Sequence, residues 1–150
     1  MAPSKENSQI DQNFDEFIHS LQEEIDQKDR TDFSPYALEL AEDLQHMGTL
    51  DPEKDVIVHE WQGPCGDSVK WYLKIENDRI EKALFQTNGC ITADIASEQT
   101  ARLVESKLLK DVALITAKDI LHALQKFPEE SHHCATLALT SLHKTLDKWD

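Results

Sequence analysis

The sequence predicts an α+β fold: a three-stranded antiparallel sheet (a meander) with helices packed on one face, plus an N-terminal helical extension. Apolar residues recur at helical spacing in the first and last thirds of the chain. Between residues 56 and 87 the pattern changes to three short runs rich in β-branched and aromatic residues. Short turns join these runs, which indicates consecutive antiparallel strands.

The extension covers residues 1–32 and precedes a domain over residues 33–150. Its helix is predicted over residues 10–28, where one face is apolar and the other is acidic and polar. The apolar residues are Ile10, Phe14, Phe17, Ile18, Leu21 and Ile25. This pattern suits a helix that packs on its own domain, and equally one that binds a second copy or a partner.

The domain begins with a second predicted helix. Ser34 is a favourable N-cap, Pro35 suits the first helical position, and apolar residues continue to Met47 before Gly48 ends the helix. The strands follow over residues 56–61, 69–76 and 79–87, and a tight turn at residues 77–78 joins the last two. The remaining predicted helices run from Ala93 to near Ser106, over 109–114, from the Thr116 cap to Phe127, and from 131–133 onward.

Composition excludes several functional classes. The 150 residues suit one domain, and 15 basic against 29 acidic residues give a formal charge of −14. So negative a chain repels phosphate backbones and anionic membrane surfaces, so we expect no nucleic acid and no membrane partner. Residues 1–11 are polar and lack the apolar stretch of a signal peptide, so we expect a cytoplasmic protein.

Three cysteines fall at the ends of predicted elements. Cys65 lies between the first two strands in the sequence Gly-Pro-Cys-Gly-Asp, and Cys90 follows Gly89 after the third strand. Cys134 follows two histidines at the start of the last helix, where free N–H groups favour a thiolate. Separated thiols in a reducing compartment indicate metal binding, catalysis or simple burial.

Metal binding would need a fourth ligand. Zinc and iron–sulfur iron both take four ligands rich in sulfur. Asp67 lies two residues after Cys65, and His133 is next to Cys134, so either could complete a set with the three thiolates. Because the chain contains no CxxC pair, the residues alone leave both metal binding and burial open.

Four segments together resemble the NifU/IscU-type iron–sulfur scaffold family. They are Gly-Pro-Cys-Gly-Asp at 63–67, Phe-Gln-Thr-Asn-Gly-Cys at 85–90, Ile-Ala-Ser at 95–97 and His-Cys-Ala-Thr-Leu-Ala at 133–138. The resemblance covers roughly residues 33–148 and implies the same sheet with packed helices. It also implies a [2Fe–2S] cluster on Cys65, Cys90 and Cys134, with Asp67 or His133 as the fourth ligand.

The resemblance further implies a function without enzymatic turnover and without catalytic residues. A cysteine desulfurase supplies sulfur, iron binds, and the assembled cluster moves to apo-proteins. We expect Cys134 to be the main sulfur acceptor, because His133 and the helix start should lower the pKa of its thiol. Asp67 would be the weak ligand that keeps the cluster transferable. A purified sample could also hold zinc, and a homodimer is compatible with this interpretation.

Three stretches depart from the family's pattern. Residues 91–94 (Ile-Thr-Ala-Asp) make the loop after the second cysteine one residue longer and add a charge. Residues 127–131 lack the lysine recognised by a dedicated chaperone and carry two acids instead, which argues against a chaperone partner. Of the N-terminal signature only Ser34 and Gly48 agree, so docking of the desulfurase is expected to differ.

Three alternatives remain. A zinc-binding sulfur carrier of the same fold (SufU-like) usually has an insertion between its second and third cysteines, and the 44 positions from Cys90 to Cys134 leave no room for one. A thiol enzyme could pair Cys134 with His133, but adjacent helical residues do not face each other and no oxyanion motif is visible. A regulatory protein without cluster chemistry would not need all three cysteines and Asp67.

Overall fold

The computed structural model of the chain describes residues 32–149. The helix predicted over residues 10–28, and nearly all of the extension over residues 1–32, lie outside the described residues. Within 32–149, no helix is both long enough and apolar enough to cross a membrane.

Three antiparallel strands form one sheet in the order β1-β2-β3. Their bounds are β1 Val56–Gln62, β2 Ser68–Glu76 and β3 Arg79–Thr87. Asn77 and Asp78 join β2 to β3 with φ angles of 52° and 59°, the left-handed values that a two-residue type I′ hairpin turn requires. The predicted meander is therefore confirmed.

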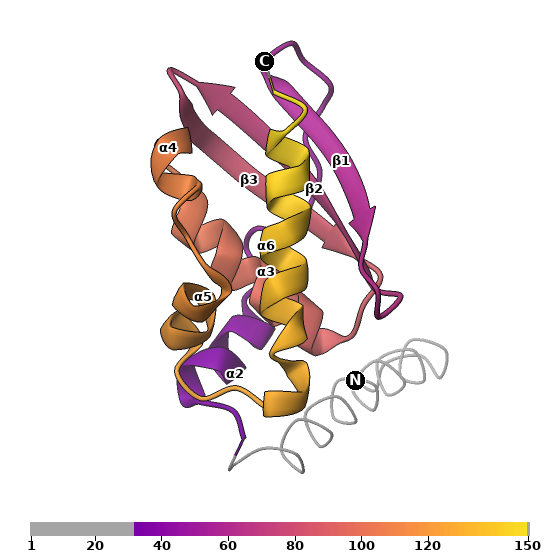
Figure 1. The fold of residues 1–150 in the computed structure, drawn as a ribbon, viewed down its shortest axis with the longest axis vertical. Helices are drawn as coiled ribbons and strands as arrows, with labels where there is room; N and C mark the ends of the chain where they lie inside the picture. The colour runs from indigo at the N-terminus through magenta and orange to yellow at the C-terminus, as the bar shows by residue number, and fades with distance from the viewer. Residues whose placement is uncertain (1–31, 150) are drawn as a thin grey trace, which may run out of the picture.

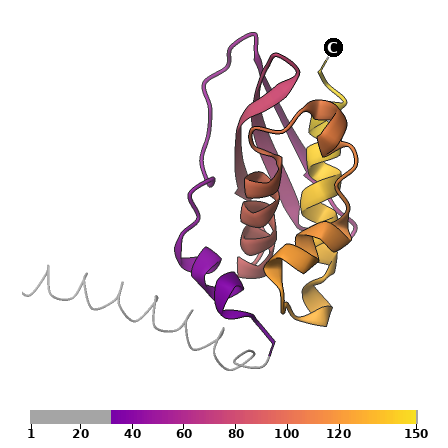
Figure 2. The ribbon, with the colours of Figure 1, turned by 90° about the vertical axis from the view of Figure 1, so that its left-hand side faces the viewer.

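Two long helices cover one face of this sheet (Figures 1 and 2). They are α3 Ile91–Val104 and α6 His133–Leu146. Beneath α6, the fully buried Trp71 of β2 donates its indole N–H to the Ser141 hydroxyl over 2.9 Å, so its polar atom is satisfied inside the core. The helical layer on one sheet face confirms the predicted α+β class.

Shorter helices close the domain around this layer. They are α2 Pro35–Glu42, α4 Leu109–Val112, α5 Ala117–Leu124 and the 3-10 turn η1 Glu129–Ser131. The predicted caps are present: the Ser34 side chain accepts from the N–H of Ala37, and Thr116 forms a capping box with Asp119.

The helix that begins at Pro35 ends earlier than predicted. It stops at Glu42 rather than continuing through Met47 to Gly48. The backbone at Met47 instead pairs with the free edge of β3: Gly48 N–H donates to the Phe85 carbonyl, and Phe85 N–H donates to the His46 carbonyl, each over 2.9 Å. Backbone hydrogen bonds to β3 thus replace helical hydrogen bonds in this segment, although its apolar residues keep helical spacing.

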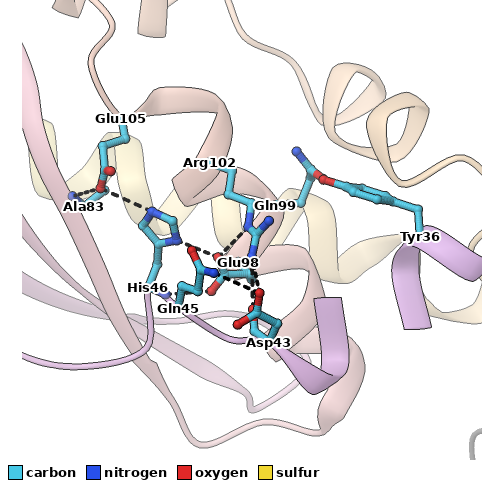
Figure 3. Close-up of polar contacts among 9 residues, drawn as sticks. All are labelled: Tyr36, Asp43, Gln45, His46, Ala83, Glu98, Gln99, Arg102 and Glu105. Atoms are coloured by element: carbon cyan, nitrogen blue, oxygen red, sulfur yellow. Dashed lines mark hydrogen bonds and ion pairs between the residues drawn. The ribbon is translucent and has the colours of Figure 1, made fainter. Parts of the chain in front are cut away.

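Side chains of α3 and of Glu105, its C-cap residue, hold this edge segment in place (Figure 3). Glu98 is fully buried, and its carboxylate accepts the backbone N–H of His46 over 2.8 Å and the Nδ1 of the same residue over 2.5 Å. Arg102 donates to Glu98 over 2.8 Å, and Glu105 contacts the other ring nitrogen of His46 at 3.3 Å. Because each partner is hydrogen-bonded, the buried charge of Glu98 is compensated.

The helix α5 also ends early, at Leu124 rather than Phe127. Gln125 takes a left-handed φ of 67°, which turns the chain out of the helix before Pro128 is reached. Phe127 is then free to pack edge-on against Phe33, with ring centroids 5.4 Å apart. Tertiary packing of this aromatic pair therefore overrides the helical pattern.

Candidate metal centre

A tight loop between β1 and β2 presents Cys65 and Asp67. Gly66 N–H donates to the Gly63 carbonyl over 3.0 Å, and Gly63 N–H donates to the Asp67 carbonyl over 2.9 Å. Gly66 has a φ of +93°, a conformation that strains any residue with a Cβ. The glycines thus fold the loop so tightly that the exposed Cys65 and the half-buried Asp67 lie close together.

The starts of α3 and α6 supply the other predicted ligands. Cys90 is the exposed N-cap residue of α3, which begins two residues earlier than predicted, and Cys134 lies in the first turn of α6. Both helices are 14 residues long. Their N-terminal ends carry partial positive charge, which favours anionic groups at this place.

Three of the five predicted ligands converge directly. Ligand atoms of Cys65, Asp67 and His133 all lie within 4.8 Å of one another. Cys90 and Cys134 lie outside this trio, and the hydroxyl of Thr92 links their sulfurs at 2.7 Å and 3.5 Å. We call Cys65, Asp67 and His133 the outer set, and Cys90 and Cys134 the inner cysteines. Sulfur, carboxylate and imidazole donors of this kind suit iron or zinc.

The two groups are neighbours. The Cys134 sulfur lies 3.7 Å from Nε2 of His133, and the charges of Cys90, Asp67 and Cys65 all act on the Cys134 thiol. All five side chains therefore belong to one site. The sequence identified these five, but it missed Thr92, whose signal was a hydroxyl two residues after a cysteine at a helix start.

Gly89 allows the outer set to form beside α3. A Cβ on this residue would lie 3.1 Å from an Asp67 carboxylate oxygen and 2.8 Å from the Cβ of Ala93. Because Gly89 has no side chain, Asp67 and Ala93 can both lie close to its backbone.

We expect Gly89→Ala to push the Asp67 carboxylate out of the outer set, and so to weaken zinc binding by about 10-fold or more. The matched control is Gly48→Ala, where a Cβ meets only a Leu84 methyl at 3.8 Å. Competition with a chelator measures both affinities. Equal affinity of Gly89→Ala and wild type would show that the contact with Asp67 is unimportant.

The Cys134 thiol has an unusual environment. It is 1% exposed, and burial raises its pKa to about 11. A hydrogen bond with Thr92 opposes this shift, and the charges of Cys90, Asp67 and Cys65 add to it. The prediction that His133 and the helix start lower this pKa is wrong: the pKa is raised, and burial of the thiol is the largest cause. At neutral pH, Cys134 of the metal-free chain is a thiol.

This shift predicts a loss of stability in alkali. Because the folded pKa is above the ordinary value of 9.0, the stabilisation is fully present below pH 9.0 and is lost as the pH rises through about 11. The loss amounts to at most about 2.7 kcal/mol. Urea unfolding of the reduced, metal-free chain at pH 8.5 and 11 should show this loss in wild type and not in Cys134→Ala. An equal decrease in both proteins would contradict the assignment.

Asp94, which belongs to a stretch that departs from the pattern expected in the sequence analysis, lies in the first turn of α3. Thr87 donates a 2.5 Å hydrogen bond to its carboxylate, while burial raises its pKa. A hollow of about 290 Å³ with mainly apolar walls opens beside Cys65 and His133. Its other walls are Trp61, Gly63, Pro64, Thr136 and Leu137.

Comparisons with known proteins agree with this architecture. IscU 1 of Archaeoglobus fulgidus, an iron–sulfur cluster assembly scaffold protein, is 32% identical over 82 residues, which cover 55% of this chain and 54% of that protein. The scaffold protein IscU of Aquifex aeolicus is 36% identical over 81 residues, which cover 53% of this chain and 52% of that protein. The alignments thus span about half the length of each relative.

A solved structure shows the same fold. The N-terminal part of a NifU-like protein from Brucella abortus superposes with a TM-score of 0.58 at 16% identity, covering 76% of this chain and 91% of that one. The family model described as the NifU-like N-terminal domain matches residues 32–150. The chain therefore belongs to the NifU-like N-terminal domain family.

Proposed function

We propose that this chain is a scaffold on which an iron–sulfur cluster is assembled and from which it passes to apo-proteins. The observation that carries the proposal is the convergence of the outer set within 4.8 Å, with the inner cysteines beside it. Relatives named as iron–sulfur cluster assembly scaffolds support it. The role is that of a carrier without enzymatic turnover, and we place it in the cytoplasm.

The cargo we propose is a [2Fe–2S] cluster. The three cysteines and either Asp67 or His133 provide the four ligands that its two irons need from protein. Two helix N-termini at the site offset the negative charge of such a cargo. In a chain with a formal charge of −14, this local positive charge lowers the electrostatic cost of binding an anion.

Sulfur would come from a cysteine desulfurase. A scaffold thiolate attacks the outer sulfur of the donor persulfide, the donor cysteine leaves as a thiolate, and two electrons from an external reductant then convert the transferred sulfur to sulfide. The exposed Cys65 and Cys90 are accessible to such a donor without movement of the chain. Cys134 as main acceptor stays a prediction, but the pKa argument for it no longer holds.

The partners are then a desulfurase and apo iron–sulfur proteins. A chaperone partner stays doubtful, because residues 127–131 lack the family's lysine and carry Glu129 and Glu130, which are exposed in η1. The formal charge of −14 would repel nucleic acid and would suit a basic protein partner. A homodimer remains compatible with the proposal.

A zinc-binding sulfur carrier is the second candidate. The outer set favours it, because one thiolate, one carboxylate and one imidazole make a good three-ligand zinc site. Against it, α3, α4, α5 and η1 occupy the interval between Cys90 and Cys134. This leaves no room for the insertion that such carriers usually have between their second and third cysteines. We therefore rank cluster assembly first.

Anaerobic reconstitution distinguishes the two candidates. The chain is incubated with ferrous iron, cysteine and a cysteine desulfurase, and its visible absorption and Mössbauer spectra are recorded. A [2Fe–2S] spectrum that disappears in Cys90→Ser is the expected result. A colourless chain that retains one tightly bound zinc and accepts sulfur without iron would instead establish the sulfur carrier.

A further inference from the structure

The Thr92 hydroxyl lies between the two inner cysteines. Thr92 is in the first turn of α3 and only 9% exposed. Its Oγ1 is 2.7 Å from the Cys90 sulfur, and the Cys134 thiol donates to the same oxygen over 3.5 Å. A hydroxyl has one proton to donate and lone pairs to accept with, so it can accept from Cys134 while it donates to Cys90.

These contacts join separate parts of the fold. Cys90 belongs to the loop that leaves β3, whereas Cys134 is 42 positions after Thr92 in the first turn of α6. Both hydrogen bonds described for the Thr92 hydroxyl go to sulfur. Thr100 of the same helix differs, because its hydroxyl donates to the Ala96 carbonyl over 2.7 Å and contacts no sulfur in the bonds described.

We propose that Thr92 is a positioning residue: its hydroxyl contacts both inner cysteines in the metal-free chain and orients Cys90 toward metal bound at the outer set. The inference rests on the proposed metal-binding function of the site. Hydrogen bonds behind metal ligands fix their orientation, and before metal binds this one hydroxyl contacts both sulfurs. In the loaded protein the hydroxyl proton bonds to the nearer sulfur, that of Cys90, and holds this side chain in its ligating rotamer.

Cobalt(II) binding without iron or a sulfur donor provides the test. Thr92→Val keeps the shape of the side chain and removes the hydroxyl, whereas Thr92→Ser keeps the hydroxyl. We expect Thr92→Val to bind cobalt about 10- to 100-fold more weakly and to shift the sulfur-to-cobalt charge-transfer band. Thr92→Ser should remain within about threefold of wild type, and should keep its band.

The matched control is Thr100→Val, the same change on the same helix away from the sulfurs. It should bind cobalt like wild type. Circular dichroism of each metal-free variant checks the fold, and Thr92→Ala replaces Thr92→Val if the latter fails to fold.

Two outcomes would overturn the inference: wild-type affinity and an unchanged band in Thr92→Val, or a Thr92→Ser variant impaired as much as Thr92→Val. Because no iron, sulfide or desulfurase is present, this experiment is independent of cluster assembly. If cobalt affinity depends on Thr92 but the wild-type chain builds no cluster, the scaffold function is disproved and the positioning role of Thr92 is retained.

Discussion

Replacing Asp67 with alanine is expected to prolong the life of the bound cluster by at least about 10-fold, equivalent to about 1.4 kcal/mol in the barrier to its loss. A carboxylate is a hard ligand, and it holds iron in a sulfur-rich site less firmly than softer donors do. With Asp67 gone, His133 is the remaining non-sulfur donor of the outer set and can complete the four ligands. Decay of the visible absorption in the presence of a chelator measures the lifetime.

A matched control separates ligand loss from loss of negative charge. Asp94 is a second carboxylate near Cys90, hydrogen-bonded by Thr87 and outside the outer set. Asp94→Ala should therefore leave the cluster lifetime close to that of wild type. A cluster in Asp67→Ala that decays at the wild-type rate or faster would show that Asp67 is not the ligand that makes the cargo transferable.

Replacing Glu98 with alanine is expected to cost about 3–5 kcal/mol of unfolding free energy. The fully buried carboxylate accepts hydrogen bonds from the backbone and ring of His46 and from Arg102, so its removal leaves these donors without their acceptor. The segment that caps the β3 edge would then detach from α3. Urea unfolding monitored by circular dichroism gives the change.

Glu105 serves as the comparison for Glu98. It also contacts His46 and accepts the N–H of Ala83 over 3.1 Å, but its side chain is 32% exposed, so solvent can replace its bonds. Glu105→Ala should cost clearly less than Glu98→Ala. Equal and small losses in the two variants would mean that the buried charge of Glu98 does not stabilise the fold.

Local patterns predicted most of the architecture. Alternating β-branched residues and the turn at Asn77 and Asp78 gave the strands correctly, because a hairpin is built from contacts close in sequence. The prediction of a helix through Met47 was wrong, because that segment pairs with Phe85, which lies on a strand that comes later in the chain. Apolar spacing cannot reveal such a long-range hydrogen bond.

The residues that form the site could be predicted from the sequence, but their arrangement in space could not. Cysteines at the ends of elements, flanked by glycine, could be recognised from residue type and position. The division into an outer set and two inner cysteines could not, because it depends on how the β1–β2 loop approaches the start of α6. For the same reason, the desolvation that raises the Cys134 pKa could not be seen in the sequence.

Transfer of a cluster tests the scaffold proposal most directly. The chain loaded by reconstitution is mixed anaerobically with an apo-ferredoxin and a chelator, and circular dichroism in the visible range follows cluster arrival on the ferredoxin. Transfer from the wild-type chain should be faster than assembly from free iron and sulfide and should resist the chelator, and transfer from Asp67→Ala should be slower. Ferredoxin that fills only at the rate of free iron and sulfide, or not at all, would contradict it.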